Sequence, residues 1–126
     1  MATVSVNGAA TAAIANLCTA QTGNGATTNI VDRGGNVGPA LLRIVTTVGA
    51  TPTCTYLVEG SADGTNWQPA VIADSTTPAT NSFATFAITT ATTTTKYIQA
   101  NQPFRYLRMT MSANTNVTTT ADVVAF

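Results

Sequence analysis

The residues that could do chemistry are few, and their spacing favours structural roles. Glu59 and Asp63 are the only carboxylates near enough in sequence to suggest the acid and base of a hydrolase. Glu59 ends a run that alternates like a β-strand, and Asp63 opens an Asp-Gly turn, so structural roles are sufficient for both. The chain has no histidine, which removes the commonest general base and any Ser-His or Cys-His nucleophile. The sequence therefore predicts no catalytic residue and no enzyme.

Other kinds of reactive site are poorly supplied as well. Two cysteines distant in sequence, Cys18 and Cys54, and five scattered carboxylates do not form a metal-ligand cluster. The glycines of residues 33–39 resemble a phosphate loop only superficially, because no Lys-Ser/Thr pair follows them. We expect no metal and no cofactor. The cysteines either form a bridge or stay as two small buried thiols, and the second is favoured for a protein made in the cytosol.

Charge is scarce and balanced. Of 126 residues, five are Lys or Arg and five are Asp or Glu, so the formal net charge is 0. A chain of this length forms one domain that buries roughly two-thirds of its unfolded surface. A neutral surface has no electrostatic reason to bind nucleic acid or an anionic membrane. We expect no signal peptide, because residues 1–4 place no basic residue ahead of an apolar stretch. We expect no membrane span, because no run of about 18 consecutive apolar residues occurs.

The clearest local element is a hairpin. An alternating run from residue 53 enters the turn at Asp63 and Gly64 and leaves it through Trp67, the only tryptophan. Gly64 can take a positive φ, and the Asp63 side chain can accept bonds from the amides that follow. We expect the strands to share one buried face, formed by Cys54, Tyr56, Val58, Trp67, Pro69 and Val71.

The fold predicted for the chain is all-β. Threonine is abundant, and branching at Cβ favours strands. Turn signals recur every 8–12 residues or so, which is typical of a sandwich. We predict a single-domain antiparallel β-sandwich of about seven or eight strands, jelly-roll or immunoglobulin-like, in residues 25–126. Residues 1–24 are predicted to form an extended N-terminal arm with a possible first strand near residues 16–21.

Two apolar segments are candidate interfaces. In the last strand, Ala121, Val123 and Ala125 are expected inside, which leaves Val124 and Phe126 facing outward. An outward aromatic terminus needs cover, either from its own sheet edge or from another subunit. The small, nearly uncharged arm can lie on its own domain or on a neighbour, as strand-addition segments do. The candidate interface residues are Ala2, Val4, Ile14, Leu17, Val124 and Phe126.

The strand of residues 104–111 alternates, and Leu107, Met109 and Met111 are expected to point inward. Its outer side chains form a second candidate surface. Arg105 and Arg108 flank Tyr106, but their odd separation projects them to opposite faces and argues against a continuous phosphate-binding stripe. Tyr106 and Arg108 could stack on a sugar ring. A capped strand surface is the favoured alternative.

Two segments resemble known families. Val58-Glu59-Gly60-Ser61-Ala62-Asp63-Gly64-Thr65-Asn66-Trp67 resembles the EGS-x-DG-x-x-W hairpin of discoidin-type and carbohydrate-binding sandwiches, and of small structural proteins from tailed-phage virions. Phe104-Arg105-Tyr106-Leu107-Arg108-Met109, with the Thr/Val-rich final strand, is similar to the YRYVRL ending of both groups. The few charges and the compact domain make the chain more similar to the phage proteins.

The resemblance implies a virion structural protein, made in the host cytoplasm. The first hypothesis is a capsid decoration or cement protein that binds the major capsid protein or other virion proteins as a homo-oligomer, with a trimer favoured. It would stabilise the assembled head shell without bond chemistry. The alternatives are a carbohydrate-binding module, using Tyr106 and Arg108, and a tail or baseplate component.

Overall fold

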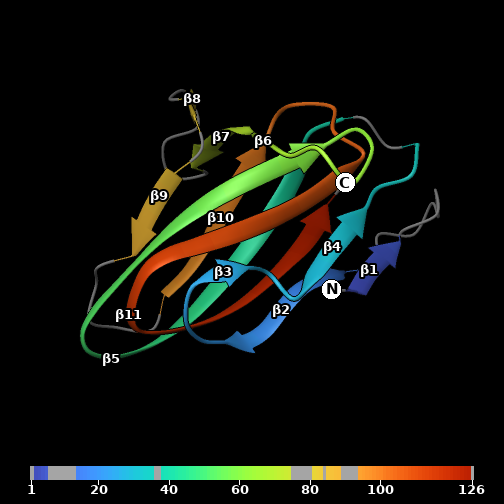
Figure 1. Ribbon diagram of the computed structural model, residues 1–126. Coiled ribbons are helices and arrows are strands. Elements are labelled where there is room, and N and C mark those ends of the chain that lie inside the picture. Colours follow the sequence, from blue (N-terminus) through green and yellow to red (C-terminus); the bar gives the residue numbers. More distant parts are fainter. Residues whose placement is uncertain are drawn as a thin grey trace.

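The computed structural model of the chain is built from β-strands (Figure 1). It describes residues 2–5, 14–35, 38–74, 81–83, 85–88 and 94–125. This confirms the all-β prediction, and no helix occurs in these ranges. The strands are β1 (Ala2–Ser5), β2 (Ala15–Gln21), β3 (Gly25–Ala26), β4 (Asn29–Asp32), β5 (Ala40–Ser61), β6 (Gln68–Pro69), β7 (Val71–Asp74), β8 (Asn81–Phe83), β9 (Thr85–Ile88), β10 (Thr94–Ala100) and β11 (Tyr106–Ala125).

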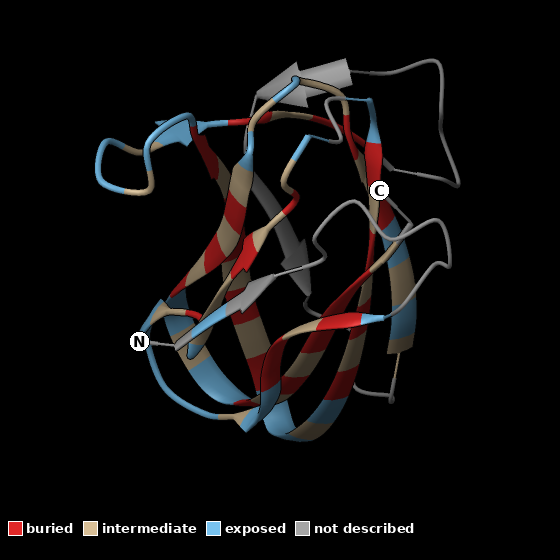
Figure 2. Ribbon diagram, turned by 90° about the vertical axis from the view of Figure 1, so that its right-hand side faces the viewer, coloured by how far each residue is buried: buried red, intermediate tan, exposed pale blue. Residues whose placement is uncertain are grey.

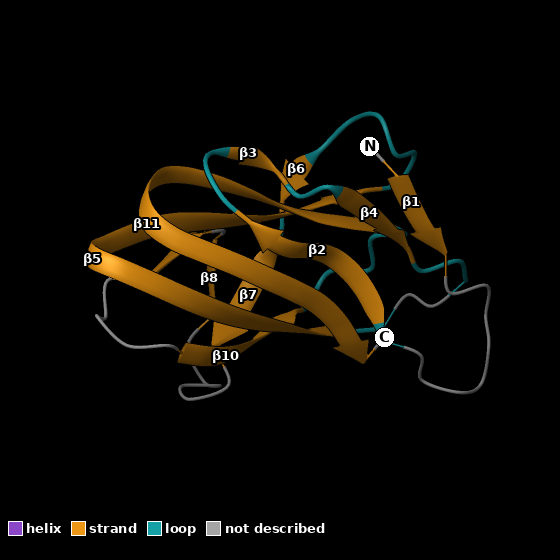
Figure 3. Cartoon of the chain, turned by 90° about the horizontal axis from the view of Figure 1, so that it is seen from below, coloured by secondary structure: helices purple, strands orange, loops and turns teal. Residues whose placement is uncertain are grey.

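Two long strands, β5 and β11, form the frame of the molecule. They pair antiparallel from Tyr106 opposite Ser61 to Ala125 opposite Leu41. The register shifts between Ser112 and Val117, where both strands bend. Each strand therefore runs along one layer, turns back and continues in the other, as Figures 1 and 3 show.

A hydrogen bond across the interior shows that the two layers face each other. The Tyr56 hydroxyl lies 2.7 Å from Thr119 Oγ1, and both residues are buried. Along the ladder, however, Tyr56 is opposite Met111, and Thr119 is opposite Thr46. The two side chains can meet only if the halves of the bent ladder stack face to face, which is the sandwich predicted from the sequence.

The remaining strands extend these two layers. In the first layer, residues 40–48 of β5 and 117–125 of β11 are flanked by β10 and β2, and β7 and β8 follow β10. In the second, residues 53–61 and 106–112 are flanked by β6 and β9 on one side and β3 and β4 on the other. β1 adds to β4 in the parallel sense and ends the sheet.

The core follows the two-residue period of the strands, visible as alternating buried and half-buried positions in Figure 2. The predicted inward positions of the strand before the hairpin turn, of residues 104–111 and of the last strand are confirmed where the structure describes the side chain, because each is at most 1% exposed. Thr46 and Thr119 are also fully buried, so hydroxyls enter the core. The confirmed positions are Cys54, Tyr56, Val58, Leu107, Met109, Met111, Ala121 and Val123.

The predicted burial after the hairpin turn is wrong by one position. Pro69 is exposed and Trp67 and Val71 are half-buried, whereas Ala70 and Ile72 are buried. The reason is that β6 pairs with β5 only at Gln68 and Pro69, after which the chain crosses to the first layer as β7. A long turn and this crossing shift the inward phase.

The strand expected near residues 16–21 is confirmed as β2. It pairs with β11 through a bulge, which turns the consecutive side chains of Leu17 and Cys18 both inward. Residues 15–21 are therefore part of the sandwich, although they fall in the expected N-terminal arm.

Cys18 and Cys54 are free thiols in the core. Cys18 Sγ lies 3.5 Å from the carbonyl oxygen of Thr119. Burial raises the pKa of the Cys18 thiol from 9.0 to about 11, and it also raises that of Cys54. Both groups are thus small apolar fillers, poor in the reactive thiolate.

We predict that neither thiol reacts with an aromatic disulfide reagent in the native protein, and that both react after denaturation without reductant. Burial blocks access, and the raised pKa suppresses the thiolate. A Thr95→Cys variant, at an exposed position, is the control for reagent access. Failure of the denatured wild type to release any thiol would show a disulfide and contradict the structure.

We also predict that Gly60→Ala destabilises the fold strongly. A Cβ at Gly60 would collide with the ring of Phe104 and lie 2.7 Å from its Cβ. Overpacking of this kind costs about 1–3 kcal/mol or more. Gly35→Ala is the matched control, because nothing lies within 4 Å of a Cβ there. Equal free energies of unfolding for the two variants in urea would contradict this packing.

Candidate functional site

The hairpin turn saturates the Asp63 carboxylate with hydrogen bonds. Its Oδ1 accepts from the amides of Thr65 and Asn66, both at 2.8 Å, and from Ser61 Oγ at 2.9 Å. Its Oδ2 accepts from Asn66 Nδ2 at 2.7 Å. Gly64 has a φ of +78°, which glycine adopts without a Cβ clash. These bonds, led by the Asn66 amide, hold the pKa of Asp63 far below its ordinary 3.8.

Glu59 belongs to a different set of contacts on the outer face of the second layer. Its Oε1 accepts from Arg108 Nε at 3.1 Å and from Thr110 Oγ1 at 2.5 Å. Among these contacts none joins Glu59 to Asp63. Each carboxylate is therefore held by its own set of donors within the chain, Glu59 between the two long strands and Asp63 inside the turn.

Trp67 and Arg108 stack on this same outer face. The Arg108 guanidinium carbon lies 4.2 Å from the centre of the Trp67 ring. Tyr106, two residues before Arg108, carries the Arg105 guanidinium 5.0 Å above its own ring. We call Glu59, Trp67, Tyr106 and Arg108 the arginine–aromatic face. Sequence reasoning placed Tyr106 and Arg108 there but missed Trp67, which it expected inside.

The arginines of this region are held by acids of the same chain. Arg105 Nε and Nη2 donate to the two carboxylate oxygens of Asp32 at 2.9 and 3.1 Å. The bond from Arg105 lowers the pKa of Asp32. Because Arg108 is paired with Glu59 at 3.1 Å, neither guanidinium carries a free charge for a phosphate backbone.

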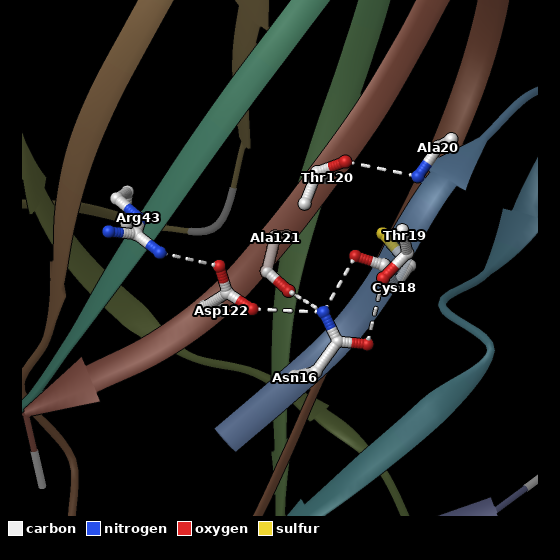
Figure 4. A network of polar contacts seen from close by, with 8 residues as sticks. All are labelled: Asn16, Cys18, Thr19, Ala20, Arg43, Thr120, Ala121 and Asp122. Atoms are coloured by element: carbon white, nitrogen blue, oxygen red, sulfur yellow. Dashed lines mark hydrogen bonds and ion pairs between the residues drawn. The ribbon is translucent and has the colours of Figure 1, made fainter. Parts of the chain in front are cut away.

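A second polar cluster ties the first layer together (Figure 4). Asp122 accepts from Arg43 Nη2 at 3.0 Å and from Asn16 Nδ2 at 2.9 Å. Asn16 Nδ2 also donates to the Cys18 carbonyl at 3.0 Å, beside the β2 bulge. Thus β5, β11 and β2 are joined across their outer faces. In the sequence, this cluster is indicated only by Arg43, the one charge in the apolar run of residues 40–48. Its partner Asp122 was not identified.

The structure divides the candidate interface residues. Ile14 is 57% exposed at the start of β2, and Val124 is half-buried. Leu17 is fully buried, so its assignment to an interface is wrong: the bulge in β2 turns it into the core. Ala2 and Val4 lie in β1, but their side chains are outside the described part, as is Phe126.

Arg33 is a buried cation that sequence reasoning assigned only to a loop. It is fully buried, and its Nη1 donates to the Phe104 carbonyl at 2.9 Å while Nη2 bonds the Gly38 carbonyl. Its Nε has no hydrogen-bond partner among the described residues, and burial lowers the pKa of the guanidinium. The Arg33 side chain thus links Gly38 to Phe104, two residues before β11.

Within the described ranges, no group of three or more Cys, Asp or Glu side chains is arranged to hold a metal. No helix in those ranges is long and apolar enough to cross a membrane. Comparisons with protein-family models, curated proteins and solved structures found no match.

We predict that Asp63 contributes stability that disappears in acid. Its pKa is lowered by folding, so its contribution is full above the ordinary value of 3.8 and is lost as the pH falls below it. The difference in unfolding free energy between wild type and Asp63→Asn should be constant above about pH 5 and shrink below it. Urea titrations across pH measure this difference.

Ala62→Ser is the control, because it alters the same turn without removing a partner of Asp63. It should follow the wild type at every pH. If the wild type and Asp63→Asn had the same unfolding free energy at pH 7, the structural role of this carboxylate would be contradicted.

Proposed function

We propose that this protein is a non-enzymatic structural component of a tailed-phage virion, and that it acts as a decoration or cement protein on the assembled head. The observation that carries the proposal is the edge strand β1. It pairs with β4 from Ala2 opposite Asn29 to Ser5 opposite Asp32 and ends the strand order of the sheet. An unpaired edge offers backbone donors and acceptors to another chain.

The surroundings of β1 support contact with another protein. Ile14 presents a large apolar side chain, 57% exposed, at the beginning of β2. Residues of β1 also contact β2, so the edge strand lies close to the strand that Ile14 precedes. Backbone pairing at the edge with apolar burial beside it is the usual chemistry of strand addition.

The ionisable groups also fit a structural role. Asp32, Glu59, Asp63 and Asp122 are each engaged by hydrogen bonds within the chain. Groups committed in this way stabilise a framework and are poorly placed to transfer protons to a substrate. The balanced charge of the whole chain leaves little repulsion between adjacent copies.

The mechanism follows from linkage between binding and assembly. A protein that binds the assembled shell and not its separate subunits stabilises the shell by mass action. At a free concentration 100-fold above Kd, each occupied site contributes about 2.7 kcal/mol. Many copies, acting as a trimer or another symmetric oligomer, would therefore resist expansion or disassembly of the shell without any bond chemistry.

A carbohydrate-binding module remains the alternative from another class, through Tyr106 and Arg108. The Trp67 ring on this face supplies a third group suited to stacking on a sugar. Against it, Arg108 already covers that ring and is bonded to Glu59. A tail or baseplate protein would use the same edge and apolar contacts as a cement protein.

We predict that Thr3→Pro abolishes binding to emptied heads of the encoding virus while the sandwich stays folded. Proline removes a backbone donor from the middle of β1 and is poorly compatible with continued pairing. The matched control is Thr3→Val, which keeps a β-branched residue at this exposed position. Cosedimentation with heads measures binding, and far-UV circular dichroism measures folding.

The wild type and Thr3→Val should saturate the heads and raise their disruption temperature. A folded Thr3→Pro variant that binds as well as Thr3→Val would refute the role of β1. If the wild-type protein stays in the supernatant when the heads are pelleted, it has no affinity for heads, and the decoration function itself would be refuted.

A further inference from the structure

A groove lies at the end of the molecule where β5 and β11 bend. It has a volume of about 470 Å³ and is lined by the β2–β3 turn and by both long strands. This volume is within the range of small-molecule sites, roughly 300–1,000 Å³. In Figures 1 and 3 the bends lie at the opposite end of the molecule from β1, so the groove is separate from the edge in the proposed function.

The lining is uncharged but rich in hydrogen-bonding groups. Thr47 and Thr118 are direct cross-strand partners and both line the groove, together with Thr22. The hydroxyls of these three residues have no partner within the described part of the chain. Val48 and Val117 also belong to the lining, but Val117 is only 3% exposed and Val48 packs against the core.

The walls of the groove are fixed before any ligand arrives. Asn116 Nδ2 donates to the Ala50 carbonyl at 2.7 Å, which ties the two bends together. Asn114 bonds Gly23, Asn24 and Val117, and so ties the β2–β3 turn to β11. The Asn114 amide and Asn116 Nδ2 are thus occupied by the frame, while the threonine hydroxyls are left for a ligand. A rigid wall lowers the entropy cost of binding.

Backbone strain gathers around the same groove. The non-glycine residues with positive φ in the described ranges are Ala20, Thr51, Ala113 and Asn116, at +48°, +43°, +51° and +56°. Ala113 and Asn116 lie in the β11 bend, and the other two lie within two residues of segments that line the groove. Strained backbone of this kind persists where the surroundings hold it, and it is frequent at binding sites.

We propose that this groove binds a neutral, polyhydroxylated ligand, a short saccharide, through the hydroxyls of Thr22, Thr47 and Thr118. A carboxylate, phosphate or ammonium group would enter without a counter-charge in the lining, which is unfavourable. A sugar offers hydroxyls that both donate and accept hydrogen bonds, and the threonine hydroxyls of the lining can do the same. The proposal goes beyond head binding and does not depend on it.

The test is a titration of the ¹⁵N-labelled protein, followed by NMR, with neutral oligomers of glucose, mannose and N-acetylglucosamine, and with a sulfated heparin fragment. At least one neutral oligomer should shift amides at residues 22–23, 47–49 and 114–118. The double variant Thr47→Val and Thr118→Val should weaken that binding roughly tenfold, since two hydrogen bonds are lost. Heparin should leave these amides unchanged.

The matched control is the double variant Thr53→Val and Thr115→Val. It removes the hydroxyls of another cross-strand pair that lies outside the groove, and it should bind as the wild type does. The proposal is overturned if no neutral oligomer shifts the groove amides, if only heparin shifts them, or if the shifts centre on Trp67 and Tyr106. Head binding by the groove variant should stay unchanged, so the two proposals fail independently.

Discussion

The continuous ladder between β5 and β11 is the constraint on which the rest of the structure depends. It runs through both layers, so its bends determine how the layers face each other. Tyr56 and Thr119 then join the layers through a buried hydrogen bond of 2.7 Å. A hydroxyl pair inside an apolar core is stable only when both partners are satisfied, so this contact favours one alignment of the layers over slipped ones.

Other strands add to this ladder, and their side chains fasten it at its outer faces. Arg43, Asp122 and Asn16 hold the first layer, and Arg108, Glu59 and Thr110 hold the second. The scarce charges of the chain are thus used mainly to connect strands. This explains how a protein with only ten charged residues can place several of them in half-buried positions without leaving them unpaired.

Much of the fold could be predicted because local patterns and tertiary packing agree. The alternation of Leu107, Met109 and Met111 matches their burial, and the Asp63–Gly64 turn has the expected chemistry. The errors arose where long-range geometry overrides a local pattern. A bulge buried Leu17, and the crossing from β6 to β7 shifted the inward phase away from Trp67.

The candidate sites were harder to predict, because they depend on contacts between residues far apart in the chain. No sequence pattern pairs Arg43 with Asp122 or places Arg108 over Trp67. The groove at the bends was equally hidden, since it needs the register that sets Thr47 opposite Thr118. Threonine-rich sequence indicated strands, but only the fold shows which hydroxyls lack partners.

Native-state hydrogen exchange tests the central claim most directly: one bent ladder holds the frame, and β1 is attached at its edge. Amides in both halves of β5 and β11 should exchange with the same free energy, that of global unfolding, whereas β1 amides should exchange through a smaller, local opening. The account would be contradicted if the two halves of β5 opened with different free energies. It would also be contradicted if the β1 amides were as protected as those of Tyr56 and Thr119.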